Sequence, residues 1–237
     1  NHYEILPNGG VEQELDRTWT DTLEVICQIL EKLDGHQIVG IAVTGQGSGT
    51  WLIDEDGSPV GRGWLWLDAR AADLVESYGK SSNARRRFHL TGTGLAACDQ
   101  GPQMLWMKKY QPEILQESAT VFHCKDWLYF NLTGVRATDP TESVFSCGDF
   151  RKRDFSDEVI ELLGLTEQKA LFPKVVDGTK VSHPLSDNVA GLCGLQSGIP
   201  VVLGYVDVIC TALGSGLYNP GYQTGCTIIG STGMHMR

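Results

Sequence analysis

The stretch Ile199-Pro200-Val201-Val202-Leu203-Gly204-Tyr205-Val206-Asp207 joins an apolar run to a single carboxylate. The β-forming residues of this run predict a buried strand that ends at Gly204. Residues 208–216 are mostly small and apolar and are compatible with a helix. Asp207 therefore stands where it can cap a helix, the commoner use of an Asp in this place. The alternative is a catalytic base at the end of a strand, where α/β folds often carry their chemistry.

Length, charge and cysteine content narrow the classes of protein. The 237 residues leave room for one large domain or two small ones. Asp and Glu number 29 against 19 Lys and Arg, and this net charge of −10 argues against a nucleic-acid or polybasic membrane partner. The seven cysteines have no metal-binding spacing, so we expect reduced thiols in a cytoplasmic protein without a metal site of its own. Because the chain begins without Met or a signal-peptide pattern, we expect a piece of a longer protein.

Alternating apolar patterns predict an α/β fold with a mixed sheet. Helical spacing is found at 12–33, 71–78, 103–110, 113–118, 125–132 and 156–163. Strand-like runs occupy 38–43, 51–54, 64–67, 119–124 and 199–203, with a hairpin turn at 55–58. Residues 174–198 are expected to be irregular, and 221–237 begin a new strand-turn-strand unit.

The small-residue stretch Gly45-Gln46-Gly47-Ser48-Gly49-Thr50 follows the strand expected at 38–43. A dinucleotide-binding interpretation needs a helix directly after it, whose N-terminus would meet the pyrophosphate. Residues 51–57 predict a strand and a turn instead, so we disfavour that interpretation. The small side chains still let a ligand approach the backbone closely.

Two further motifs have both a structural and a functional interpretation. The segment Trp66-Leu67-Asp68-Ala69-Arg70 can be a core Trp beside a surface Asp–Arg pair, or a Trp face and a carboxylate that hold a polyhydroxylated ligand. The turn Gly230-Ser231-Thr232 can offer N–H groups and hydroxyls to a phosphate, or can be an ordinary tight turn. The scattered His89, His123 and His183 are taken as structural.

In order and over nearly the whole chain, these stretches resemble the FGGY family of carbohydrate kinases. The resemblance is carried by Gly40-Ile41-Ala42-Val43-Thr44-Gly45-Gln46, by Trp66-Leu67-Asp68-Ala69-Arg70, by Lys125-Asp126-Trp127-Leu128 with Leu132-Thr133-Gly134, and by Leu203-Gly204-Tyr205-Val206-Asp207. It implies a ribonuclease H-like (actin-like ATPase) fold, with a mixed sheet flanked by helices, in the first domain of a two-domain kinase. Residues 1–217 would be the N-terminal substrate-binding domain without its initial hairpin, and 218–237 the start of the C-terminal nucleotide-binding domain.

The resemblance also implies roles for single residues. Asp207 would be the catalytic base, and Gly230, Ser231 and Thr232 would contact the phosphates. The substrate-binding candidates are Gln46, Gly47, Ser48, Trp66, Asp68 and Cys98. Gly47 and Ser48 stand where glycerol kinases have Arg-Glu and D-xylulose kinases have Met-His, and Cys98 stands where glycerol kinases have an aromatic residue. The chain is therefore more similar to the branch of erythritol and L-xylulose kinases.

The activity implied is transfer of the ATP γ-phosphoryl group to a terminal hydroxyl of a small polyol, with erythritol as the first candidate. ATP and Mg²⁺ are the cofactors implied, and a small polyol or ketose is the partner, with no nucleic acid and no membrane. A homodimer is the candidate assembly. The alternatives are an L-xylulose or other pentulose kinase and, more remotely, a non-catalytic sugar-binding relative.

Overall fold

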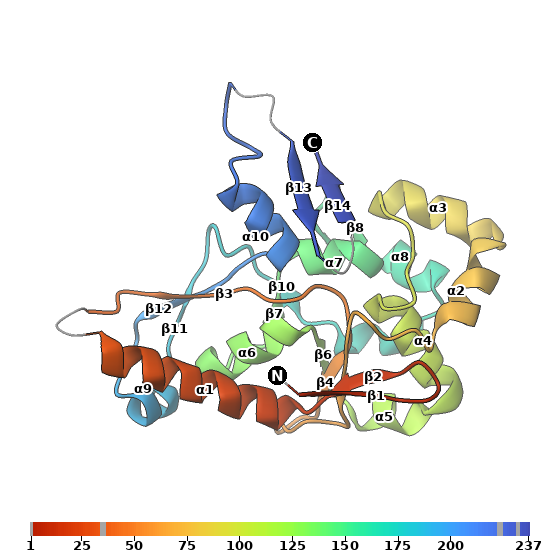
Figure 1. Ribbon diagram of the computed structural model, residues 1–237. Coiled ribbons are helices and arrows are strands. Elements are labelled where there is room, and N and C mark those ends of the chain that lie inside the picture. The colour runs from red at the N-terminus through yellow and green to blue at the C-terminus, as the bar shows by residue number, and fades with distance from the viewer. Residues whose placement is uncertain (1, 34–36, 222–224, 231–232) are drawn as a thin grey trace.

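The strand that precedes Asp207 lies at the centre of a three-stranded mixed sheet. The computed structural model describes residues 2–33, 37–221, 225–230 and 233–237. In it β12 (Pro200–Leu203) runs parallel to β3 (Ile41–Val43) and pairs antiparallel with β11 (His183–Pro184). This arrangement confirms a mixed sheet (Figure 1). Because the two parallel strands end side by side, the segments after Val43 and Leu203 leave the sheet together.

The other strands form small pairs around this sheet. β1, β2 and β5 make a second three-stranded sheet, and the remaining pairs are β4 with β6, β7 with β10, β8 with β9, and β13 with β14. Their bounds are β1 (Tyr3–Ile5), β2 (Val11–Gln13), β4 (Trp51–Ile53), β5 (Gly63–Trp64), β6 (Thr120–Phe122), β7 (Ala137–Thr138), β8 (Gly148–Asp149), β9 (Asp154–Phe155), β10 (Lys174–Val175), β13 (Cys226–Ile229) and β14 (Gly233–Met236).

Helices enclose the strands on both sides of the molecule (Figure 1). The long α1 turns its partly buried Trp19, Leu23 and Ile26 toward the core cluster that contains Val201 and Leu203. The helices are α1 (Leu15–Lys32), α2 (Ala72–Gly79), α3 (Ser82–Thr91), α4 (Gln100–Tyr110), α5 (Pro112–Glu117), α6 (Cys124–Thr133), α7 (Pro140–Ser146), α8 (Asp157–Leu162), α9 (Asp187–Cys193) and α10 (Asp207–Gly214), with a 3₁₀ turn at Thr166–Leu171. Within the described residues, no helix combines the length and apolar character needed to cross a membrane.

Most of the predicted elements are confirmed, and the differences have physical causes. The expected helix at 12–33 is α1, the one at 125–132 is α6, and Gly57 adopts a φ of +86° in the predicted hairpin turn. The expectation that 174–198 would be irregular was wrong, because these residues form β10, β11 and α9. Helices α3 and α7 were missed as well: α3 is rich in arginine and α7 is short, so neither has a clear apolar period.

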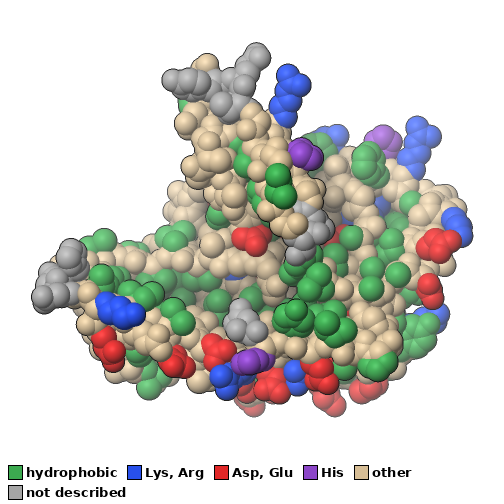
Figure 2. All heavy atoms as spheres, in the orientation of Figure 1, with side chains coloured by type: hydrophobic (Ala, Val, Ile, Leu, Met, Phe, Trp, Pro, Cys, Tyr) green, Lys and Arg blue, Asp and Glu red, His purple; other side chains and the backbone are tan. Residues whose placement is uncertain are grey.

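The end of the chain packs apart from the main body. The hairpin β13–β14 shares a small core cluster with Ala212 and Leu217 at the end of α10. Figures 1 and 2 show this hairpin and α10 rising from the body, with hydrophobic side chains on the body beneath the hairpin. The division at 217/218 into two domains stays a prediction.

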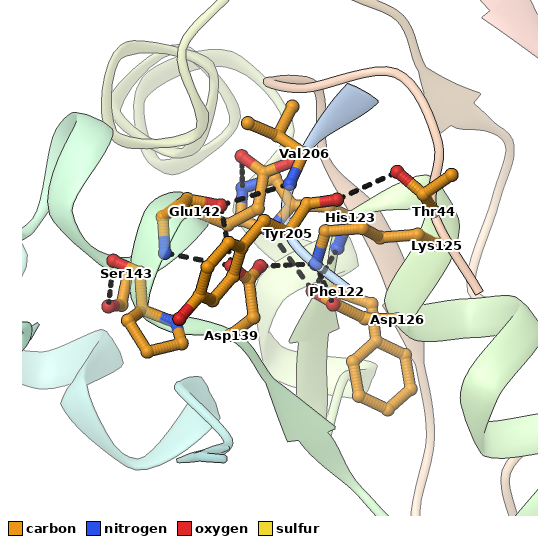
Figure 3. A network of polar contacts seen from close by, with 12 residues as sticks. Thr44, Phe122, His123, Lys125, Asp126, Asp139, Glu142, Ser143, Tyr205 and Val206 are labelled. Atoms are coloured by element: carbon orange, nitrogen blue, oxygen red, sulfur yellow. Dashed lines mark hydrogen bonds and ion pairs between the residues drawn. The ribbon is translucent and has the colours of Figure 1, made fainter. Parts of the chain in front are cut away.

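A buried charged network joins α6 to the segment before α7 (Figure 3). The fully buried Lys125 ammonium donates to Asp126 at 3.0 Å and also to Asp139. His123 caps α6 through a reciprocal contact with Asp126. Burial alone would raise the pKa of Asp126, but Lys125 and His123 outweigh burial and lower that pKa to about 2. Lys125 and Asp126 are therefore held in their charged forms and stabilise each other out of contact with water.

We expect Lys125→Met to destabilise the protein by about 3–5 kcal/mol, because it leaves two buried carboxylates without their cation. Urea unfolding followed by circular dichroism measures this loss. The matched control is Lys152→Met, since Lys152 is exposed and its replacement should change stability by less than about 0.5 kcal/mol. Equal stability of the two variants would contradict this account of the network.

Candidate active site

The turn between β12 and α10 is held on all sides by hydrogen bonds. Thr44 Oγ1 donates to Tyr205 O at 2.7 Å, and Asp207 N donates to Gly45 O at 3.0 Å. From the α7 side, Val206 N donates to Thr141 Oγ1 at 3.1 Å. These bonds come from two different segments, the loop after β3 and the start of α7, so they fix the place where α10 begins (Figure 3).

Asp207 is the first residue of α10, and Val206 occupies the cap position. Of the two interpretations of Asp207, the one as a helix cap is therefore off by one residue, and the one as a catalytic base stays a prediction. Its Oδ1 accepts from Val208 N at 2.7 Å, so the carboxylate still satisfies one N–H of the first turn. The side chain is exposed and lines a cavity. A carboxylate so placed can meet an incoming hydroxyl.

The loop after β3 approaches this turn so closely that one position must be glycine. A Cβ on Gly47 would lie 2.5 Å from Val206 Cγ2 and 3.6 Å from Glu142 Oε1.

No helix follows the loop, since Thr50 bridges to Trp64 and β4 begins at Trp51, which excludes the dinucleotide-binding interpretation.

Ser48 adopts a backbone conformation that is uncommon for a residue with a side chain. Its φ is +60°, in the left-handed region. Two carboxylates hold it there: Ser48 N donates to Glu142 Oε2 at 3.3 Å, and Ser48 Oγ donates to Asp99 Oδ1 at 3.0 Å. Such strain persists only where the surroundings fix it, and it is frequent at functional sites.

Burial shifts the acidity of the groups around this loop. It raises the pKa of the fully buried Glu142 to about 7 and that of the Cys98 thiol to about 11, so Cys98 is a neutral thiol. Burial also raises the pKa of Asp99, which is opposed by hydrogen bonds from Ala96 N and Ser48. Among the residues that the structure describes, none is a hydrogen-bond partner of Glu142 Oε1.

These segments surround one cavity of about 670 Å³, within the range of small-molecule sites. Most of the residues expected from the sequence to form the site line it: Gln46, Gly47, Ser48, Trp66, Cys98, Asp207 and Gly230. Residues 46–48 lie far in the sequence from Ile228, Gly230 and Met234, which also line the cavity, so only the fold brings them together. Ser231 and Thr232 lie outside the described residues.

Asp68 does not line the cavity. It is 1% exposed, and its carboxylate accepts from Val11 N at 2.9 Å and from Arg70 Nη2 at 2.7 Å. The Arg70 guanidinium lies 3.3 Å from the ring centroid of Trp64. The Asp–Arg pair is therefore buried and joins β2 to the segment after β5, which corrects the expectation of a surface pair.

Sequence reasoning missed Asp99, Glu142 and Arg87 as parts of the site. Asp99 and Glu142 each precede or begin a helix, and the cap sequence Asp139-Pro140-Thr141 could have pointed to α7. The buried Arg87 donates to Thr93 O, Gly94 O and Phe145 O, and so holds one wall of the cavity. No sequence pattern indicates a buried arginine in a polar helix.

Gly47→Ala should displace the turn that carries Asp207, because its Cβ would clash with Val206. We expect a loss of about 1–3 kcal/mol in stability, typical of overpacking. Adding Val206→Ala removes the clashing methyl groups and should restore much of that loss. Thermal unfolding of both variants measures the effect; a double variant no more stable than Gly47→Ala would refute the steric explanation.

Comparison with known proteins gives consistent matches over the whole chain. Residues 2–214 match the N-terminal domain of the FGGY family of carbohydrate kinases. The chain is 49% identical over 239 residues to erythritol kinase of Brucella abortus (strain 2308), covering 100% of this chain and 46% of that protein. A probable L-xylulose kinase of Pasteurella multocida (strain Pm70) is 30% identical, with 88% and 44% covered. The chain thus spans about half the length of the curated relatives it matches.

Solved structures of sugar kinases share this fold. The crystal structure of xylulose kinase from Rhodospirillum rubrum superimposes with a TM-score of 0.89 at 22% identity, covering 98% of this chain and 48% of that one. This likeness confirms the ribonuclease H-like, actin-like fold expected from the motifs. With its motifs in register and residues 2–214 matched, the chain belongs to the FGGY family of carbohydrate kinases.

Proposed function

We propose that the protein transfers the γ-phosphoryl group of ATP to a terminal hydroxyl of a small polyol, with erythritol as the first candidate. The observation that carries this proposal is the exposed Asp207 carboxylate, fixed at the start of α10 on a cavity that also holds the polar loop 46–48. The similarity to erythritol kinase of B. abortus supports the choice of polyol.

In this proposal Asp207 accepts the proton of the attacking hydroxyl and orients its oxygen. Gln46, Ser48 and Trp66 hold the polyol: the polar groups exchange hydrogen bonds with hydroxyls, and the Trp66 face packs against C–H groups. Gly230, with Ser231 and Thr232 beyond it, contacts the phosphates. Most of the rate acceleration comes from positioning and from neutralising phosphate charge.

ATP enters as a substrate and Mg²⁺ accompanies it. The described residues contain no group of three or more His, Cys, Asp or Glu side chains able to hold a metal ion. This composition fits Mg²⁺ bound chiefly by phosphate oxygens and water, with at most one or two carboxylates from the protein. When bound, Mg²⁺ neutralises charge on the β- and γ-phosphates. Cytoplasmic location and a homodimer stay predictions.

Asp207→Asn should lower kcat by about 10²–10⁴, the usual contribution of a general base, while KM for the polyol changes little. Steady-state kinetics of the full-length protein measures both. The matched control is Asp157→Asn, since Asp157 is the exposed first residue of α8 and lies outside the cavity. Turnover of Asp207→Asn close to that of the control would remove Asp207 from its assigned role.

The second candidate is an L-xylulose or other pentulose kinase, which the relative from P. multocida favours. A panel of erythritol, threitol, xylitol, L-xylulose and D-xylulose with ATP, followed by ADP release, separates the two. We expect kcat/KM for erythritol to exceed that for either ketose by about tenfold or more. A preference for a ketose would favour the second candidate, and binding of a sugar without ADP release would favour a non-catalytic relative.

A further inference from the structure

The cavity holds a second carboxylate, Asp99, which lies just before α4. It is 9% exposed and lines the cavity together with Asp207. Asp99 Oδ2 accepts from Ala96 N at 2.8 Å, and Oδ1 accepts from Ser48 Oγ at 3.0 Å. A carboxylate has about four acceptor positions, so Asp99 keeps acceptor capacity beyond these two bonds.

Ser48 also offers a hydrogen-bond acceptor to the cavity. Its hydroxyl proton is directed to Asp99, and its oxygen, which is also in hydrogen-bond contact with the Cys98 side chain, keeps a lone pair that can accept from a ligand. Glu142 holds Ser48 N, and the left-handed backbone of Ser48 fixes the orientation of the side chain. The Ser48–Asp99 pair therefore presents acceptors and no free donor.

The charged side chains around the cavity also favour a ligand that donates hydrogen bonds. Among its described lining residues are two carboxylates, Asp99 and Asp207, and no Lys, Arg or His. The nearby Arg87 is 2% exposed and donates to three backbone carbonyls instead of lining the cavity. Where Ser48 and Asp99 form it, the wall suits a neutral ligand group that donates hydrogen bonds, and it disfavours a carbonyl or an anion beside that pair.

We propose that Asp99, with Ser48, is the specificity-determining pair of this site: it accepts hydrogen bonds from a hydroxyl of a fully reduced polyol and rejects a ketose carbonyl or a sugar acid there. This inference rests on the proposed function, because it names the pair that selects the substrate of that same site. It assigns Asp99 no part in the proton transfer.

The test is Asp99→Asn in the full-length protein, assayed with ATP and either erythritol or L-xylulose. Asn keeps an acceptor for Ala96 N but replaces the other oxygen by a donor. We expect KM for erythritol to rise about 10–100-fold with kcat within about threefold of wild type, and the preference for erythritol over L-xylulose to fall about tenfold or more. KM and preference both within twofold of wild type would overturn the proposal.

Two further variants separate recognition from folding. Asp149→Asn is the matched control: Asp149 is also nearly buried and accepts from Arg151 N at 2.9 Å, but it does not line the cavity, so its KM and preference should stay as in wild type. Ser48→Gly removes the hydroxyl and suits a φ of +60°. If Asp99→Asn fails to fold, Ser48→Gly decides: a rise in KM of about 3–10-fold supports the proposal, and an unchanged KM overturns it.

The outcome also distinguishes this inference from the proposed function. If the wild type phosphorylates ketoses and no polyol, the kinase assignment stands and the selection by Asp99 is overturned. If the wild type releases no ADP with any sugar, the proposed function fails, and calorimetry with erythritol then tests Asp99 by itself. Erythritol binding that is present in wild type and at least tenfold weaker in Asp99→Asn supports the proposal; equal binding, or none in wild type, overturns it.

Discussion

The contacts of the buried Lys125 ammonium with Asp126 and Asp139 are the interactions on which the rest of the site depends. It lies between Asp126, which fixes the start of α6, and Asp139, which accepts from Thr141 N at the start of α7. Thr141 in turn accepts from Val206 N, one residue before Asp207. Because each bond in this series is buried or partly buried, the position of Asp207 is tied to a charge pair far from the solvent. Burying three charged groups is costly unless each has its partners, so the arrangement tolerates little variation.

A steric constraint accompanies this electrostatic one. The loop 45–49 follows β3 and the turn before α10 follows β12, and both begin at the same edge of the sheet because these strands are parallel neighbours. Val206 of the turn fills the space that a side chain at position 47 would occupy. The cavity side of the loop is therefore formed by Gln46, by Ser48 and by the backbone of Gly47. This explains in physical terms why small residues follow Gln46 here, and it leaves room for a ligand close to the backbone.

Sequence reasoning predicted well what local patterns encode and poorly what tertiary contacts create. The apolar run before Gly204 and the small residues after Val43 identified the strands and loops that carry Asp207 and Ser48. Asp99, Glu142 and Arg87 could not be found in this way, since their roles depend on partners 51, 94 and 58 residues away in the chain. Asp68 shows the opposite case: a motif that suggests a ligand contact is used to join β2 to the segment after β5.

The two carboxylates of the cavity, Asp99 and Asp207, differ in exposure and in hydrogen bonding. Asp99 is nearly buried and has a partner on each oxygen, so it cannot move, and its geometry can discriminate between a hydroxyl and a carbonyl. Asp207 is exposed and uses one oxygen on the neighbouring N–H, which suits the contact with an incoming hydroxyl proposed for it. These surroundings agree with the two roles that we propose, recognition for Asp99 and proton acceptance for Asp207.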